Sequence, residues 1–407
     1  MPAFTRSDKL RVCLLLVCLV PFVATVFFGF AAGDPALVTL STGLAIATTG
    51  FALAWGTESL QFVVSQVLAL AVLALVQVLP EYSVEVVLAY RGATDPTILH
   101  YATAAMTGAN RLLLGLGWPT VYALSHFASR RSGGRGGDVV LERQQSVAIF
   151  FLGLATLYSF VVVLRSNLGP VDAGVLLALF VAYVYIAKRL PPHDVSRMEE
   201  LEGPALAVAK LSGSRKVLAI AFFVLLGTVV IAFGSEPFVG SFLAVTGSLN
   251  LNQYLLIQWL TPILTELPEA TTVFYWAART GRGSLALANL ISSKLNQWTI
   301  LVSTIPIVYA VALGSFQGIA LTQLQVDEIL LTASQSLYGF VCLTDLKLSF
   351  REAGTLFALF VLQLVVPSVR IEVSFLYLAL AGLEVLLVRG KMPVFDVVRG
   401  LVKEHVH

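Results

Sequence analysis

The sequence predicts an all-α polytopic membrane protein with about twelve transmembrane helices. Of its 407 residues, 57% are hydrophobic and only 12% are charged, against about 25% charged residues in an ordinary soluble domain. A soluble chain of this size could not bury so much apolar surface, and a disordered chain would be less hydrophobic and more charged. The net charge of +2 shows no basic excess that would point to nucleic acid, and the three cysteines suggest no disulfide framework.

Apolar runs follow one another along the whole chain, and a helix needs about 20 such residues to cross a bilayer. The expected spans, with approximate ends, are 12–32, 36–66, 67–91, 97–128, 146–165, 169–189, 216–248, 252–279, 283–315, 326–346, 352–368 and 371–389. Several are long enough to be tilted or broken. The first follows three basic residues, as a signal peptide does, but it lacks a small-residue cleavage site and is expected to be a retained helix.

Basic residues in the loops predict the orientation, because cytoplasmic loops carry the excess of Lys and Arg. They gather in four places: the N-terminus, the 129–145 loop, the 189–215 loop and the C-terminal tail. With twelve spans and both termini cytoplasmic, all four lie on the inside. The opposite loops are short and carry little charge apart from Arg91 and Arg370. The expected location is the cell membrane.

Two Pro-Glu pairs mark an internal repeat. Leu79-Pro80-Glu81-Tyr82-Ser83 in the first half corresponds to Leu267-Pro268-Glu269-Ala270-Thr271 in the second. A second polar cluster follows each pair, Thr107-Gly108-Ala109-Asn110-Arg111 and Ser293-Lys294-Leu295-Asn296-Gln297. The spacing from Glu to Asn is 29 residues in one half and 27 in the other. Internal similarity of this kind indicates a fold built from repeated units.

A third correspondence precedes the pairs, between Gly56-Thr57-Glu58 and Gly234-Ser235-Glu236. In the predicted topology the Glu81 helix runs outward and the Glu269 helix inward, so the two halves are inverted repeats, an architecture typical of secondary transporters. Pro80 and Pro268 are expected to break their helices and to free carbonyl groups that face a cavity. The predicted organisation is an extra helix over 1–35, repeats over 36–189 and 216–368, a cytoplasmic linker over 190–215, and an extra helix and tail over 369–407.

The polar clusters have the chemistry of a site for a hard cation. A carboxylate inside a membrane is costly unless it is paired or coordinated, and Ca²⁺ prefers carboxylate, amide, carbonyl and hydroxyl oxygens. Glu81 and Glu269 supply carboxylates, and Asn110 and Asn296 supply amide oxygens. Hydroxyl groups come from Ser83, Thr107, Thr271, Ser292 and Ser293. Because no Cys or His belongs to these polar clusters, selectivity for soft metals is not expected. Glu85 and Glu266 are expected to be structural or peripheral.

These motifs resemble the alpha repeats of the calcium/cation antiporter superfamily, the membrane domains of sodium/calcium exchangers. Thr265-Glu266-Leu267-Pro268-Glu269 is similar to the first part of the family pattern, and Ser292 and Asn296 follow Glu269 by 23 and 27 residues. The first repeat is more divergent, because Gln77-Val78-Leu79-Pro80-Glu81 lacks the family's Thr-Ser pair. The resemblance covers about 36–189 and 216–368. The resemblance implies that the helices at 12–32 and 371–389 would be additions to the usual ten-helix core.

The resemblance implies an antiporter that exchanges Ca²⁺ for Na⁺ or H⁺ by alternating access. Glu81 and Glu269 would be its central carboxylates, Asn110 and Asn296 would complete the site, and Gln77 and Thr265 would flank it. Lys294 departs from the pattern. A fixed ammonium group can take the place of one coupling cation, so Lys294, with Ser293 beside it, is expected to reduce the number of bound ions or to couple transport to protons.

Other functions remain open from the sequence alone. A Na⁺/H⁺ antiporter could use the same fold. An intramembrane enzyme is a different class, but the sequence has no His-Glu-x-x-His motif, and most of its aspartates lie at span ends. A channel or a non-transporting scaffold is a third class. The expectation is a transporter that is not an enzyme, with no cofactor or protein partner, whose partners are inorganic cations and the lipid bilayer.

Overall fold

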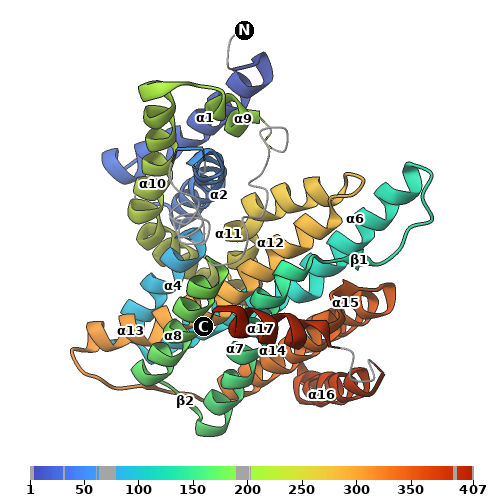
Figure 1. The fold of residues 1–407 in the computed structure, drawn as a ribbon. Coiled ribbons are helices and arrows are strands. Elements are labelled where there is room, and N and C mark those ends of the chain that lie inside the picture. The colour runs from blue at the N-terminus through green and yellow to red at the C-terminus, as the bar shows by residue number, and fades with distance from the viewer. Residues whose placement is uncertain are drawn as a thin grey trace. The chain divides into compact units, whose positions relative to one another are not determined.

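The computed structural model describes residues 4–30, 33–60, 62–63, 79–188, 201, 203–387 and 392–405, with side chains described as far as residue 400. Helices occupy the described part of all twelve ranges predicted to span the membrane. Residues 64–78, which include the end of the second range and the first part of the third, lie outside the described part, and so do residues 190–200 and 202 of the predicted linker. The all-α membrane class predicted from the sequence is confirmed (Figure 1).

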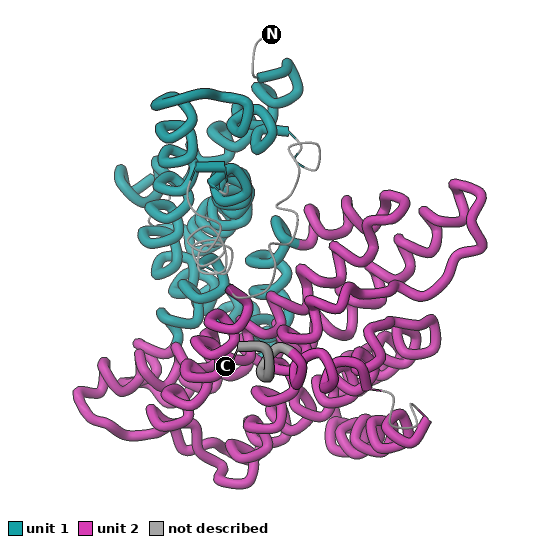
Figure 2. The backbone as a smooth tube through the Cα atoms, in the orientation of Figure 1, with its two compact units in different colours: residues 1–88, 190–269 teal, residues 89–189, 270–407 magenta. Residues whose placement is uncertain are grey.

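The chain forms two compact units, and each takes segments from both halves of the sequence (Figure 2). Unit 1 contains residues 1–88 and 190–269, and unit 2 contains residues 89–189 and 270–407. The division falls inside α4 (Leu79–Gly92) and inside α11 (Gln253–Ala277), the two helices that carry the Pro-Glu pairs.

Unit 1 is built around a long pair of packed helices. Besides the first parts of α4 and α11, its described residues form α1 (Arg6–Phe28), α2 (Pro35–Leu60), α9 (Gly203–Ala209) and α10 (Gly213–Ser248). α2 and α10 lie close because small residues line their contact. A Cβ atom on Gly56 would come within 2.8 Å of a Val224 methyl group. Buried aromatic side chains such as Phe22 and Phe223 fill the core beside this pair.

The described part of unit 2 contains the remaining helices and four short strands. Its first half runs through α5 (Pro96–Leu112), η1 (Leu113–Gly117), α6 (Trp118–Arg131), β1 (Val139–Val140), η2 (Arg143–Gln145), α7 (Ser146–Arg165), β2 (Asn167–Leu168) and α8 (Pro170–Ala187). Its second half runs through α12 (Gly283–Asn296), η4 (Gln297–Leu301), α13 (Val302–Leu313), β3 (Ile319–Ala320), α14 (Gln323–Cys342), η5 (Leu343–Asp345), β4 (Lys347–Leu348), α15 (Phe350–Val365), η6 (Pro367–Val369), α16 (Arg370–Leu387) and α17 (Pro393–His405).

The order of elements in unit 2 repeats, and the second copy is inverted. The series α6-β1-α7-β2-α8 is followed by α13-β3-α14-β4-α15. β1 pairs with β4 and β2 pairs with β3, both antiparallel. Because α7 leads from β1 to β2 and α14 leads from β3 to β4, this pairing makes α7 and α14 run in opposite directions. The inverted repeat predicted from the polar motifs is therefore visible in the backbone.

A turn of π-helix interrupts each helix that carries the second polar cluster. η1 follows α5 directly, and η4 follows α12 directly. π-Helical turns are rare in proteins, and many of those that occur lie at functional sites. These two interruptions were not predicted from the sequence.

Six described helical segments are long and apolar enough to cross a membrane, or seven if the bent pair of α15 with α16 forms one span. The remaining predicted ranges carry more polar residues or shorter helices. One detail differs from the prediction. Pro268 lies inside α11, which stays helical from Gln253 to Ala277, so it removes a backbone hydrogen bond without ending the helix. Pro80 is the second residue of α4 as described, and the residues before Leu79 lie outside the described part of the chain.

Candidate cation site

The first Pro-Glu pair lies in the opening turn of α4, where Glu81 is buried. Ser83 donates a hydrogen bond to the Pro80 carbonyl oxygen at 2.8 Å and accepts one from Ser235 of α10 at 2.7 Å. Ser235 belongs to the Gly-Ser-Glu segment that forms the third sequence correspondence. The structure thus joins this segment to the Pro-Glu helix, while the neighbouring Glu236 side chain is exposed.

The second Pro-Glu pair lies near the end of α11. Glu269 is partly buried, and the Thr271 side chain is exposed. The Thr265 hydroxyl lies inside and donates to the Thr261 carbonyl oxygen at 3.1 Å. Pro268 packs against Gly50 of α2, where a Cβ atom would collide with the proline ring. A residue without a side chain is therefore required opposite this proline.

The two polar clusters of unit 2 meet at Asn110 of α5 and Lys294 of α12. The Lys294 ammonium donates to the backbone oxygen and to the side-chain oxygen Oδ1 of Asn110, each at 2.7 Å. Both side chains are fully buried. The Asn110 amide nitrogen donates to the Met106 carbonyl oxygen at 2.9 Å. The oxygen atoms that Asn110 could offer to a cation are therefore bound to a fixed ammonium group.

The other members of these clusters lie on the same two helices. Thr107 is buried and donates to the Thr103 carbonyl oxygen at 2.9 Å. Ser292 donates to the Ala288 carbonyl oxygen at 3.1 Å, and Ser293 and Asn296 are buried. The Lys294 ammonium also lies 5.4 Å from the centre of the Trp298 ring, within the range of a cation–π interaction.

The π-helical turns give the repeat a register that differs from the sequence motif. η1 begins three residues after Asn110, and η4 begins three residues after Lys294. In this register Lys294 is the counterpart of Asn110, whereas the sequence motif pairs Asn110 with Asn296. A contact between two equivalent residues is what a two-fold relation produces near its axis.

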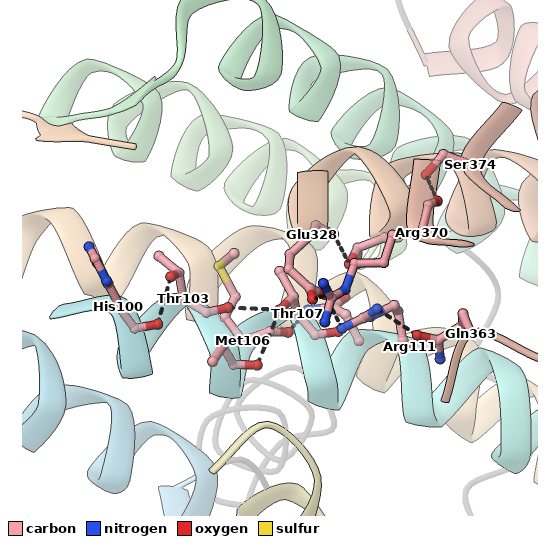
Figure 3. A network of polar contacts seen from close by, with 12 residues as sticks. His100, Thr103, Met106, Thr107, Arg111, Glu328, Gln363, Arg370 and Ser374 are labelled. Carbon is pink, nitrogen blue, oxygen red and sulfur yellow. Dashed lines mark hydrogen bonds and ion pairs between the residues drawn. The ribbon is translucent and has the colours of Figure 1, made fainter. Parts of the chain in front are cut away.

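A buried ionic network starts at Arg111, the residue after Asn110 (Figure 3). The Arg111 guanidinium forms an ion pair with Glu328 of α14 and donates to Gln363 Oε1 of α15 at 2.8 Å. Arg370, the first residue of α16, pairs with the second oxygen of Glu328 at 2.6 Å. The sequence pattern included Arg111 in the first polar cluster, but it missed Glu328, which lies more than 200 residues from Arg111 in the chain.

Glu85, which was expected from the sequence to be structural or peripheral, is deeply buried. It lies one turn after Glu81 on the same face of α4. It is 1% exposed, and neither of its carboxyl oxygens has a hydrogen-bond partner. Among the described residues, the other buried carboxyl groups all have partners. The four-residue spacing from Glu81 was the available signal.

The predicted site residues are divided between the two units. Glu81, Ser83, Thr265 and Glu269 belong to unit 1. Unit 2 holds Thr107, Asn110, Thr271, Ser292, Ser293, Lys294 and Asn296. Gln77, the remaining predicted residue, lies outside the described part of the chain.

Inverted helical repeats that each carry a Pro-Glu pair are typical of the architecture of a secondary transporter. The chain belongs to the sodium/calcium exchanger protein family, whose sequence model matches residues 35–188 and 219–369. It is a member of the calcium/cation antiporter superfamily, as the motifs suggested. No curated protein matches the sequence.

Solved structures agree with this assignment. A crystal structure of the H⁺/Ca²⁺ exchanger CAX is similar with a TM-score of 0.90 and 32% sequence identity, over 98% of this chain and 98% of that one. The structure of native YfkE is similar with a TM-score of 0.59 and 16% identity, over 86% of this chain and 98% of that one. For the sodium-calcium exchanger NCX_Mj the values are 0.53 and 14%, over 82% and 98%. The last two are likenesses of fold.

Proposed function

We propose that this exchanger moves Ca²⁺ across the membrane in exchange for H⁺. The observation that carries the proposal is the contact of Lys294 with both oxygen atoms of Asn110, each at 2.7 Å. Those oxygens are ligands that Na⁺ would need, and a fixed ammonium group holds them instead. The similarity to CAX, described as an H⁺/Ca²⁺ exchanger, supports the same coupling ion.

A permanent ammonium group in this position replaces a coupling cation. It carries the same charge as Na⁺ and satisfies the same oxygens, but the polypeptide keeps it in place during the transport cycle. The hydroxyl groups of Thr107 and Ser292 bond to backbone carbonyls of their own helices. Na⁺ would therefore have to displace Lys294 before it could use the amide group of Asn110.

Glu81 and Glu269 remain as the groups that carry the exchanged ions. Two carboxylates balance one Ca²⁺, and two protons balance the same pair of carboxylates when Ca²⁺ has left. Either load makes the pair neutral, which lowers the cost of keeping it inside a membrane. Ca²⁺ and H⁺ would thus compete for the same groups, and the bound load would change as the site opens to one side and then to the other.

Uptake of radioactive Ca²⁺ into proteoliposomes tests the proposal. One set of vesicles carries an outward H⁺ gradient, and a matched set carries an outward Na⁺ gradient at equal pH on both sides. The proposal expects uptake in the first set only. The variants Glu81→Gln and Glu269→Gln are expected to show no uptake in either set, because each removes one charge of the pair.

Uptake driven by Na⁺ alone would contradict the assignment of the coupling ion. Absence of Ca²⁺ uptake under both gradients would contradict the assignment of the substrate. We also propose that both termini are cytoplasmic, because the four basic regions then share one side of a cell membrane. Labelling of cysteines introduced into the 129–145 loop, with an impermeant reagent on intact cells, would check that orientation.

A further inference from the structure

The network around Glu328 connects the helix that bears Asn110 to three other helices of unit 2. Arg111 of α5 contacts Glu328 of α14 and Gln363 of α15, and Glu328 contacts Arg370 of α16. Arg111 also donates from Nε to the Thr107 carbonyl oxygen at 3.3 Å, so its side chain lies along α5. Thr107, Asn110 and Arg111 thus share one turn of helix, and the network holds that turn from one side.

A second contact between α14 and α5 makes the attachment firmer. Gln325 Nε2 of α14 donates to the Thr103 hydroxyl of α5 at 2.8 Å. Gln325 is itself held by the capping box at the start of α14, where its Oε1 accepts from the Thr322 backbone N–H at 2.9 Å. α14 therefore contacts α5 two turns apart, at Thr103 and at Arg111, which fixes how far α5 can rotate or slide against it.

The charges of the network explain why Glu328 is its central residue. Glu328 and Arg111 are each 1% exposed, and the Arg370 side chain is 20% exposed. One carboxylate receives two guanidinium groups, one on each oxygen. Because a buried charge is costly without its partner, loss of Glu328 would leave Arg111 to find another acceptor. The acceptors within reach on its own helix include the carbonyl groups of the turn that bears Thr107 and Asn110.

We propose that Glu328 and Arg370 are positioning residues for Ca²⁺ transport, which fix the Thr107–Asn110 turn of α5 through Arg111. The inference rests on the proposed function, and it adds α16 to the elements that tune the site. α16 lies beyond the matched region of the family model, which ends at residue 369. The chain of contacts would make the Lys294–Asn110 pair sensitive to a residue at the start of that helix.

A matched ion pair in the same part of the fold provides the control. Arg351 of α15 bonds to both carboxyl oxygens of Glu384 of α16, at 2.6 and 2.7 Å, and Glu384 is buried. This pair also joins α15 to α16, but neither partner has a contact with α5 among those described. Loss of the Arg351–Glu384 pair should therefore affect stability without affecting the turn that bears Asn110.

The experiment compares Glu328→Gln, Arg370→Gln and the control Glu384→Gln in proteoliposomes, with initial uptake rates measured over a range of Ca²⁺ concentrations. Outer partners of ion-binding groups typically alter affinity by about 10- to 100-fold. We expect Glu328→Gln to raise the KM for Ca²⁺ by roughly 10-fold or more and Arg370→Gln to raise it less. Glu384→Gln should leave the KM for Ca²⁺ unchanged. Glu328→Asp, which keeps a carboxylate, should raise the KM less than Glu328→Gln does.

Direct Ca²⁺ binding, measured by calorimetry in detergent, separates this inference from the proposed function. If the wild type neither binds nor transports Ca²⁺, the proposed function and this inference fail together. If the wild type binds Ca²⁺ but Glu328→Gln and Arg370→Gln keep its affinity and KM, only the positioning role is refuted. Arg370 is partly exposed, so its variant keeps the test available if Glu328→Gln does not fold.

Discussion

Replacement of Lys294 with methionine removes an ammonium group from Asn110 while keeping a long, unbranched side chain. The structure sets the size of the effect. Two acceptor atoms lose donors at 2.7 Å in a fully buried position. A buried acceptor without a partner costs about 1–3 kcal/mol, so the variant should lose roughly 2–6 kcal/mol of stability in the absence of a replacement cation.

Na⁺ should recover part of this loss, because it can bind the oxygens that Lys294 releases. A ligand present at about 100 times its Kd stabilises the folded state by about 2.7 kcal/mol. The melting temperature of Lys294→Met in detergent should therefore rise as Na⁺ replaces a large organic cation at constant ionic strength. The wild type should show no such rise. Lys294→Arg, which keeps the charge, is the control for the loss of the ammonium group.

Transport should change in the same direction. Ca²⁺ uptake by Lys294→Met should become sensitive to Na⁺, through inhibition or through coupling, and its ratio of H⁺ to Ca²⁺ should differ from that of the wild type. A variant that unfolds at the same temperature with and without Na⁺, and that keeps the wild-type ratio and pH dependence, would refute the reasoning that Lys294 takes the place of a cation.

Three further predictions follow from individual contacts. Glu81→Gln and Glu269→Gln should each lower Ca²⁺ uptake at least about 100-fold, the upper range for loss of a metal-binding partner, with little change in the melting temperature. Wild-type uptake by both variants would contradict the central role of this pair of carboxylates. Glu85→Met should stabilise the fold by about 1–3 kcal/mol, because it removes a buried carboxyl group without a hydrogen-bond partner. A lower melting temperature for the variant would contradict this, because it would mean that the Glu85 carboxyl makes a favourable interaction in the folded protein. Gly50→Val should destabilise unit 1 by about 1–3 kcal/mol through its collision with Pro268, while Gly174→Val, in open space, should not.

The sequence predicted the features that depend on local composition. Each membrane helix must satisfy its backbone within itself, so an apolar run marks each span, and helices are found in all twelve ranges. The Pro-Glu pairs were visible because both copies of the motif survive at similar spacing. The inversion of the two halves followed from the number of spans between the copies, and the pairing of β1 with β4 and β2 with β3 confirms it.

The contacts across the fold could not be predicted from one sequence. Lys294 was recognised as unusual, but its partner Asn110 is 184 residues away, and nothing local links the two. Glu328 follows a span start and resembles an ordinary helix-end acid, although two arginines hold it inside the protein. The π-helical turns have no clear local signal, because the two segments, Leu113–Gly117 and Gln297–Leu301, share no sequence pattern. In the register that these turns set, Lys294 rather than Asn296 is the counterpart of Asn110.

The most direct test of the account is whether a Ca²⁺ gradient alone moves protons. Proteoliposomes that hold a pH-sensitive dye would receive external Ca²⁺ in a medium free of Na⁺, with the membrane potential clamped. The account predicts that the interior becomes more alkaline as Ca²⁺ enters and H⁺ leaves, and that Glu81→Gln and Glu269→Gln abolish this change. Entry of Ca²⁺ without a change of internal pH would contradict it.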